Sequence, residues 1–319
     1  MIDFRYHLVS IIAVFLALAI GMVLGSAVFG SPLLKNLRAH VKSVRETNDD
    51  LKNQISDLHA VVAANRSFAE EVEPWLVAGA LKDTPVVVVE PAGTNSSVVS
   101  ALQDEVATAG GTVTGTISLT DKFALASAPD REELGLILGI APRKVPMLRA
   151  RAGAELGQRM GVAANPPARG GIADEITPGS KNKQLLGDLQ RAGFVSLGSG
   201  TGPEAVPAGA VFLVVAGDAG APPFNATNLL IPFVRHLAGV GAVVTVASPS
   251  ASSWKVVDEI RSESRTAAEV STVDDAETIP GHISSVLTLD RSADDPADHY
   301  GTGPGATSVI PSPPPSQNR

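Results

Sequence analysis

The hydrophobic positions of the first 70 residues form two adjoining patterns. From Val9 to Phe29 the chain is largely apolar and contains no charged residue. About 20 residues at a rise of 1.5 Å span the roughly 30 Å hydrocarbon core of a bilayer, so we predict a transmembrane helix over residues 9–30, after an N-terminal tail of residues 1–8. A cleaved signal peptide is the alternative, because Arg5 and the small residues Gly25-Ser26-Ala27 fit that pattern as well. The apolar run exceeds the usual signal-peptide core of about 7–15 residues, which favours an uncleaved anchor.

Small residues recur at four-residue intervals along this predicted helix, at Ala13, Ala17, Gly21 and Gly25. The last two form a GxxxG pattern, which lets two membrane helices approach closely enough for backbone contact. Glycine is common in membrane helices in general, so a monomeric anchor is the alternative. We predict that Gly21 and Gly25 contribute to a homodimer contact.

A heptad pattern follows the apolar segment almost without interruption. Its alternating a and d positions are Leu34, Leu37, Val41, Val44, Asn48, Leu51, Ile55, Leu58 and Val62. This run predicts a coiled-coil stalk over residues 31–72. Asn48 stands at an a position, where a buried asparagine favours a parallel two-stranded assembly. We therefore predict a parallel homodimer formed through the membrane helix and the stalk together.

Beyond the stalk, strand-like and helix-like hydrophobic patterns alternate. Pro74 and the segment 79–85 are expected to end the long helix. Strands are expected at 86–89, 112–119, 194–197, 211–215 and 243–247, and helices at 98–109, 185–192, 228–238 and 253–260; an apolar stretch follows at 283–289. The run at 86–89 is β-branched throughout, which is typical of a strand buried on both faces. We predict an α/β domain over residues 73–290 with a doubly wound, mostly parallel sheet.

Two segments depart from this alternation. Helical patterns at 130–140 and 147–160, with a polar loop near 166–171, predict a helical insertion over about 125–180. From Asp290 the chain is rich in Ser, Asp, Pro and Gly, with too few apolar residues to be held by a core. We predict that residues 291–319 form a disordered tail.

Composition narrows the classes of function. The net charge is −8, which argues against a nucleic-acid partner, because phosphate binding needs clustered basic residues. The stalk carries a basic row at its e positions, Arg38, Arg45, Lys52 and His59. This row is most simply a solvated face, and contact with lipid headgroups or an acidic partner is the alternative. The absence of cysteine excludes disulfides and thiolate metal sites.

The sequence shows no catalytic constellation. The loop 93–97 follows the first predicted strand, where doubly wound sheets bind ligands, but it lacks the spacing of dinucleotide or phosphate-binding motifs. A helix cap by Asn95 or Ser96 explains it better. We interpret Asp274 and Asp275 as a helix cap or solvated turn, because no Ser or Cys motif with a partnering His accompanies them. We therefore expect that the protein is not an enzyme.

Histidine and methionine are too scattered to form a recognisable metal motif. None of the six histidines stands four residues from another, the spacing that places two on one helix face. Cu(I) favours thiolate and thioether ligands, and Met147 and Met160 do not make a cluster. A copper site would have to bring together scattered residues such as His236, His282 and His299 by folding or dimerisation.

Blocks near both ends of the chain resemble one family in combination. These are VSIIAVFLALAIGMVLGS near the N-terminus, STVDD at 271–275, PGHISSVLTL at 280–289 and HYGTG at 299–303, and together with the coiled coil and α/β domain they resemble the actinobacterial MctB family. The resemblance implies a role in copper homeostasis, in which the protein limits the intracellular copper concentration. Copper is therefore the candidate ligand. Related corynebacterial members of the family are associated with a membrane partner, SteA, so the resemblance also implies a SteA-like membrane partner. Asp274, Asp275, Tyr300 and Gly301 are motif residues of unknown role.

Two function hypotheses follow. The first is an envelope protein of copper homeostasis or copper transport that acts as a dimer or with partners. The second is a dimeric scaffold for cell envelope integrity and division that binds no copper directly.

The orientation of the anchor can be read in two ways. A literal count of positive charges puts the C-terminal side in the cytoplasm, because Lys35, Arg38, Lys42 and Arg45 follow the predicted helix and only Arg5 precedes it. The family resemblance implies the opposite, a single-pass anchor in the cell membrane with an extracytoplasmic domain.

Overall fold

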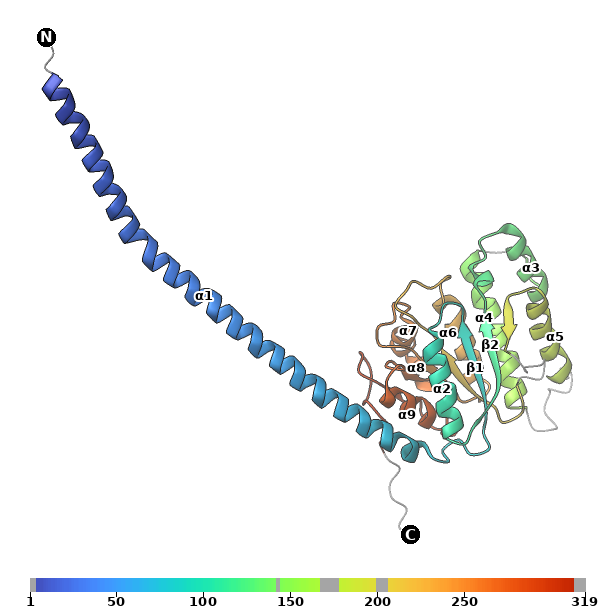
Figure 1. The fold of residues 1–319 in the computed structure, drawn as a ribbon. Helices are drawn as coiled ribbons and strands as arrows, with labels where there is room; N and C mark the ends of the chain where they lie inside the picture. The colour runs from blue at the N-terminus through green and yellow to red at the C-terminus, as the bar shows by residue number, and fades with distance from the viewer. Residues whose placement is uncertain (1–3, 142–143, 167–177, 199–205, 313–319) are drawn as a thin grey trace. The chain divides into compact units, whose positions relative to one another are not determined.

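A computed structural model describes residues 4–141, 144–166, 178–198 and 206–312 of the 319-residue chain. The chain divides into two compact units, Met1–Phe68 and Ala69–Arg319. The first consists of most of one long helix, and the second contains the sheet and the remaining helices (Figure 1). The two units are described separately below.

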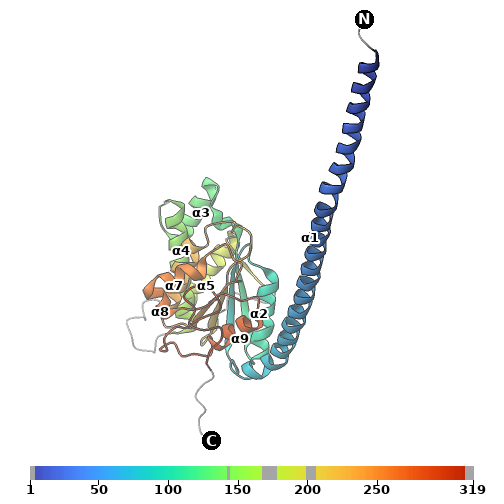
Figure 2. The ribbon, with the colours of Figure 1, turned by 90° about the vertical axis from the view of Figure 1, so that its left-hand side faces the viewer.

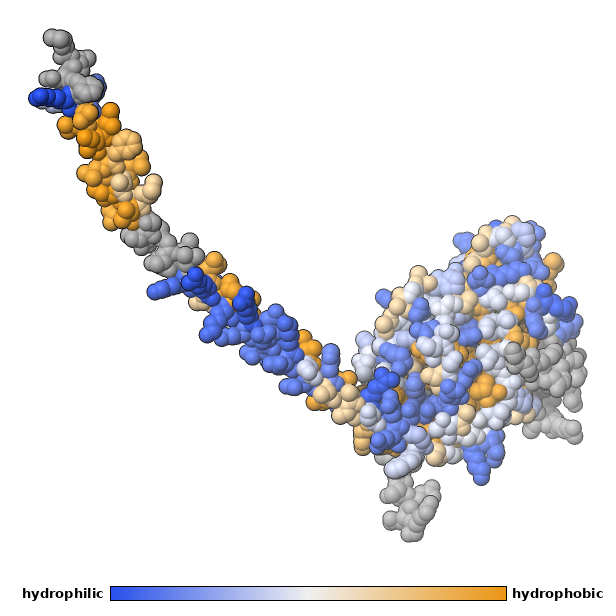
Figure 3. Space-filling view, viewed as in Figure 1, coloured by the Kyte–Doolittle hydropathy of each residue, from blue (hydrophilic) through white to orange (hydrophobic). Residues whose placement is uncertain are grey.

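The first 77 residues contain a single α-helix, α1, over Phe4–Val77. It runs without a break from the predicted membrane segment into the predicted stalk. Figure 3 shows an apolar band near its N-terminal end and a mostly hydrophilic surface with separate apolar patches farther along. Among the described residues, Arg5–Gly25 is the one segment that is long and apolar enough to cross a membrane.

The expected break at Pro74 is wrong, because α1 continues through this residue to Val77. A proline in the final turn costs few backbone hydrogen bonds, since the helix is about to end. Gly79 then adopts a left-handed conformation with φ of 77°, and the Ala80 N–H donates to the Val77 carbonyl. A glycine in this conformation is a common helix terminator.

The second unit is built on a seven-stranded sheet in its described part, with the order β3-β2-β1-β4-β5-β6-β7. Neighbouring strands are parallel except β2 and β3, which are antiparallel. The strands are β1 (Pro85–Pro91), β2 (Thr112–Leu119), β3 (Val195–Leu197), β4 (Val211–Val215), β5 (Val244–Ala247), β6 (Ser271–Val273) and β7 (His299–Tyr300). The prediction of a mostly parallel α/β sheet is confirmed, and the strands expected at 112–119 and 211–215 have the same bounds.

Helices cover both faces of the sheet (Figures 1 and 2). Alternate side chains of β1 explain why, because Val86 and Val88 join one buried cluster and Val87 and Val89 join the other. The first cluster includes α2 (Ser96–Thr108), α9 (Ile279–Leu287) and the end of α1. Burying each valine side chain contributes about 1.5–3 kcal/mol, so the unbroken run in β1 stabilises both layers.

The opposite face carries the remaining helices and most of the large buried side chains. Its elements are η1 (Asp121–Ala124), α3 (Ala128–Leu138), α4 (Val145–Ala164), α5 (Pro178–Arg191), α6 (Thr227–Ala238), α7 (Val256–Ser262) and α8 (Ser264–Glu269). The segment predicted as a helical insertion therefore supplies α3 and α4, which share one core with α6. The polar loop expected near 166–171 lies mainly outside the described residues.

Glycines allow α4 and α6 to pack closely. A Cβ at Gly153 would lie 2.1 Å from the Leu229 carbonyl oxygen, and one at Gly157 would lie 2.2 Å from the Phe233 carbonyl oxygen. Neither distance is compatible with a real side chain. The two helix backbones therefore touch, which fixes α4 as an integral layer of the domain.

The expected disordered tail is wrong for residues 291–312, which the structure describes. His299–Tyr300 forms β7, paired in parallel with β6, and the Tyr300 residue is only 8% exposed. The segment is held by polar contacts to the sheet edge, which a count of its apolar residues does not register. Residues 313–319 lie outside the described part.

Candidate functional site

The polar residues that the sequence singled out near the C-terminus gather at one edge of the sheet. Asp274 follows β6, and the parallel neighbour β5 leads into Ser248. Because parallel strands end at the same edge, these loops lie side by side, and the segment after β7 folds across them. Backbone bonds from Ser248 N–H to the Val273 carbonyl (2.9 Å) and from Asp274 N–H to the Tyr300 carbonyl (3.2 Å) join the three strand ends.

Asp274 is a buried ion-pair partner, so the predicted solvated turn is wrong for this residue. Its carboxylate accepts from Nη1 of Arg261, and the two side chains are 13% and 5% exposed. Its Oδ1 also accepts the Thr302 and Gly303 backbone N–H groups, at 2.8 and 2.9 Å. Arg261 lies on α7, so one ion pair joins this helix, β6 and the segment after β7.

Arg261 uses its remaining donors on β6, on β7 and on the segment after β7. Nε donates to Thr272 Oγ1 at 2.8 Å, Nη2 donates to the Tyr300 carbonyl at 2.8 Å, and Nη1 donates to the Pro304 carbonyl at 3.0 Å. Residues 299–304, which we name the C-terminal strap, are thereby fastened to the sheet. Sequence reasoning missed Arg261, because it has no motif neighbour and is one of many surface-type residues in its helix.

The glycines of the HYGTG block are required by this contact. Gly301 has φ of 123°, a conformation that side chains other than glycine rarely adopt. A Cβ at Gly301 would lie 2.2 Å from Asp274 Oδ1, and one at Gly303 would lie 2.9 Å from Asp274 Oδ2. The motif residues Asp274, Tyr300 and Gly301 therefore form one structural unit, in which the strap wraps a carboxylate.

Asp275 is also buried, with 3% of the residue exposed. Burial, followed by the nearby Asp274 charge, raises the pKa of the Asp275 carboxyl to about 6. Its Oδ1 has no hydrogen-bond partner in the described part of the chain. Its carbonyl accepts from Thr278, the N-cap residue of α9, and packs against Gly281, where a Cβ would come within 2.1 Å. The interpretation as a solvated turn is therefore wrong for Asp275 too, and its backbone supports the start of α9.

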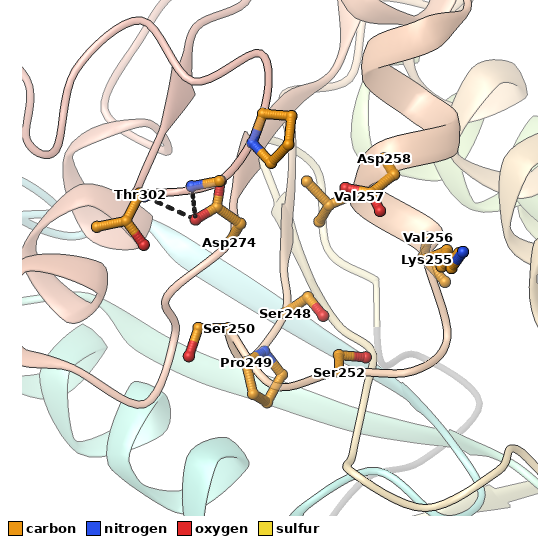
Figure 4. Close-up of a pocket in the computed structure, with 12 residues that line it drawn as sticks. Ser248, Pro249, Ser250, Ser252, Lys255, Val256, Val257, Asp258, Asp274 and Thr302 are labelled. Carbon is orange, nitrogen blue, oxygen red and sulfur yellow. Dashed lines mark hydrogen bonds between the residues drawn. The ribbon is translucent and has the colours of Figure 1, made fainter.

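A small pocket of about 170 Å³, with both polar and apolar lining residues, opens beside the ion pair (Figure 4). Ser248, Ser250 and Ser252 line it from the loop after β5, and Asp274 and Thr302 line it from the strap side. Figure 4 places Val257 and Asp258 of α7 across from Asp274 and Thr302. Ser250 is engaged by the Glu277 carboxylate through both its N–H and its hydroxyl. The pocket thus presents hydroxyl groups beside the Asp274 carboxylate, which Arg261 neutralises, and Lys255 and Asp258 also belong to its lining.

Protein side chains occupy the space beside Gly93 in the loop after β1. Its Gly93 lies against Pro223 and Trp254, since a Cβ there would be 3.1 Å from Pro223 Cδ and 3.4 Å from Trp254 Cζ2. The Trp254 indole N–H donates to the Gly220 carbonyl at 2.9 Å, which holds the ring in place. Asn95 caps α2 by accepting from the Ser97 N–H, so the predicted helix cap is confirmed.

The structure does not bring His236, His282 and His299 together. Each Nδ1 contacts a different element: the Pro232 carbonyl within α6 (2.7 Å), the Glu73 carboxylate of α1 (3.2 Å) and the Thr272 hydroxyl of β6 (2.8 Å), respectively. Burial and then the Arg261 charge lower the pKa of His299. In the part of the chain that the structure describes, no group of three His, Cys, Asp or Glu side chains has metal-binding geometry.

Comparisons with known proteins extend over nearly the whole chain. Residues 1–311 match a family described as "Copper transport outer membrane protein, MctB". The copper transporter MctB of Mycobacterium tuberculosis (strain ATCC 25618 / H37Rv) is 32% identical over 323 residues, covering 97% of this chain and 99% of that protein. The copper transporter MctB of Mycobacterium leprae (strain TN) is 32% identical over 321 residues with the same coverage.

The chain belongs to the MctB family. The expected family resemblance is therefore confirmed, and the relatives that it matches are named copper transporters. The structure adds a role for three motif residues of this family member, because Asp274, Tyr300 and Gly301 fasten the strap. It assigns no ligand to them, since the Asp274 carboxylate is fully engaged by Arg261 and two backbone N–H groups.

Proposed function

We propose that this chain is a membrane-anchored envelope protein that acts in copper homeostasis. The observation that carries the proposal is 32% identity over 97% of the chain to proteins named copper transporter MctB. The family is not an enzyme family by name, which agrees with the non-enzymatic role that we expected. The helix at Arg5–Gly25 supports anchoring by a single membrane span.

The proposal includes a parallel homodimer. In the single chain the apolar a and d residues from Leu37 onward are exposed, between 44% for Val41 and 67% for Val44, and Leu37, Leu51, Ile55, Leu58 and Val62 fall within this range. An unbroken heptad stripe of this kind loses contact with water when a second copy packs along it. Asn48 would pair with its counterpart. Gly21 and Gly25, where an added Cβ would meet no atom of another residue's side chain or of another element within 4 Å, would allow the membrane helices to meet.

The anchoring restricts how copper could be moved. A single helix cannot enclose a pore, because a lipid-exposed channel wall must satisfy all of its backbone groups internally. We therefore place copper as the cargo of an assembly, formed by several copies or with a SteA-like membrane partner. The domain is proposed to lie outside the cytoplasmic membrane, joined to it by a coiled coil over 31–72 and folded as a doubly wound sheet.

The decisive experiment measures cellular copper and cell morphology in one deletion strain. We expect higher intracellular copper at elevated external copper, restored by the wild-type gene. Normal copper content at all external concentrations would contradict the copper proposal. Protease added to intact cells tests the orientation, and cleavage of the domain only after lysis would contradict an extracytoplasmic position.

A second candidate function rests on the positions of the histidines. Because His236, His282 and His299 contact three separate elements, we also consider a dimeric scaffold for envelope integrity and division that does not bind copper. Titration calorimetry of the full chain in detergent with Cu(II), and with Cu(I) under reducing conditions, separates the two functions. Binding that is lost in the triple His→Ala variant supports direct copper handling. Division defects at ordinary copper levels, without binding, support the scaffold.

A further inference from the structure

Two buried carboxyl groups and an imidazole meet where the last turns of α1 contact the sheet domain. Residues 69–77 of α1 belong to the second unit. Within them, Glu73 Oε1 lies 3.2 Å from Nδ1 of His282 on α9. Glu105 of α2 lies next to the same Glu73 side chain, whose charge and hydrogen bonding act on its carboxyl group, and the buried Glu105 Oε1 has no hydrogen-bond partner among the described residues. Glu73 therefore connects three elements, two of which belong to the helical layer on one face of the sheet.

The cluster is largely shielded from water. Glu105 is 7% exposed, and the Glu73 and His282 side chains are 14% and 17% exposed. Burial, followed by the charge of Glu73 and the hydrogen bond to it, raises the pKa of Glu105 to about 7. Two carboxyl groups can hydrogen bond to each other only when one of them carries a proton. The proton on Glu105 is thus what makes this contact attractive near neutral pH.

The other charged residues on the elements around the cluster are exposed. On α9, His282 is the single titratable residue, and on α2 the neighbouring Asp104 is exposed. The remaining charged residues on the adjoining elements, Glu70 and Glu71 of α1 and Lys82 and Asp83 of the following loop, are exposed as well. The interactions that shift Glu105 come from Glu73 and from burial. The response to pH therefore centres on this pair.

We propose that Glu105, Glu73 and His282 form a proton-dependent clamp that fastens the last two turns of α1 to α2 and α9. While Glu105 is protonated, it donates to the Glu73 carboxylate, which also contacts His282. When the proton is lost, two adjacent carboxylates repel each other in a poorly hydrated space, where such repulsion is strong. The residues around Glu73 then loosen, while Val77 remains buried in the apolar cluster. This inference does not depend on copper handling.

The test is hydrogen–deuterium exchange of residues 69–77, measured on the full chain in detergent between pH 6 and pH 8.5 and corrected for the pH dependence of intrinsic exchange. We expect the corrected exchange rate to rise by about tenfold across this range, because the opening equilibrium changes by a factor of ten per pH unit only until the pH passes the Glu105 pKa of about 7. Peptides from β1 should show no comparable change.

Two variants and one control make the result specific. In Glu105→Gln the amide donates to Glu73 at every pH, so the segment should stay protected throughout. Glu73→Gln removes the same repulsion from the other side and should also flatten the profile. Glu71→Gln, an exposed change on the same helix, should keep the wild-type profile. A flat wild-type profile, or a wild-type profile in both Gln variants, would overturn the clamp.

Discussion

Replacing Arg261 by methionine should detach the C-terminal strap and destabilise the whole α/β domain. Methionine keeps an apolar stem of similar length but removes every donor. The change leaves the Asp274 carboxylate buried, with two backbone N–H groups as its hydrogen-bond donors and no counter-charge. It also leaves the Tyr300 and Pro304 carbonyls without the guanidinium.

The magnitude follows from the burial of the pair. Removing one partner of a buried ion pair costs about 3–5 kcal/mol, mainly because the remaining charge stays in a low-dielectric site. Arg261 is 5% exposed and Asp274 is 13% exposed at the side chain, so little solvent is present to screen that charge. A typical domain has about 5–15 kcal/mol of total stability, so Arg261→Met should remove a large share of it.

The assay is urea unfolding of the full chain in detergent, followed by the fluorescence of the buried Trp254 in a Trp75→Phe background. Limited proteolysis reports separately on the strap, which should become sensitive before the rest of the domain. The double variant Arg261→Met with Asp274→Asn removes the uncompensated charge, and its cost should fall below the sum of the two single changes. Loss of less than about 1 kcal/mol in Arg261→Met, or strictly additive costs, would refute the assigned role of the pair.

Three further predictions concern other parts of the molecule. Gly157→Ala places a Cβ 2.2 Å from the Phe233 carbonyl oxygen and should cost about 1–3 kcal/mol in thermal or urea unfolding, whereas Gly187→Ala, with no atom within 4 Å, should be near neutral. Because the pKa of Asp275 is raised to about 6, the folded state binds more protons than the unfolded state between about pH 4 and 6. The free energy of unfolding should therefore fall by about 2–3 kcal/mol as pH rises through this window. Asp275→Asn should flatten this part of the plot of stability against pH, and an unchanged slope would contradict the prediction. Asn48→Val should strengthen coiled-coil association but weaken its preference for two chains, which analytical ultracentrifugation would detect as larger oligomers; a monomeric wild-type chain would remove the basis of this prediction.

The strongly periodic elements could be predicted from the sequence. The β-branched run in β1 and the strands β2 and β4 are recognisable in the sequence because their residue types follow their burial. Side chains are buried along all or most of β1 and β4, and more buried and less buried side chains alternate along much of β2. Short elements were missed for the opposite reason. β6 has three residues, Ser271–Val273, of which two are hydroxyl-bearing, and its identity as a strand depends on neighbours far away in the sequence.

The contacts of the candidate site could be predicted only in part. The motif blocks identified Asp274 and Gly301 as residues of interest, but nothing in the sequence indicated that Arg261 would neutralise the carboxylate. The same limit explains the error over the tail, because its order comes from backbone carbonyls and N–H groups that any residue possesses. Glu105 gave no signal either, since a single acid within an amphipathic helix resembles a solvated one.

β7 has a consequence for how the domain can be made and cut. It is the last strand in the described part of the chain and covers the outer side of β6, whose three residues are all buried. An uncovered strand edge offers unpaired N–H and C=O groups to other chains. A chain that stops before residue 299, through premature termination or proteolysis, would therefore expose β6 as an edge strand that can pair with other chains and aggregate. The described residues from 299 to 312 thus protect this edge of the sheet from other chains.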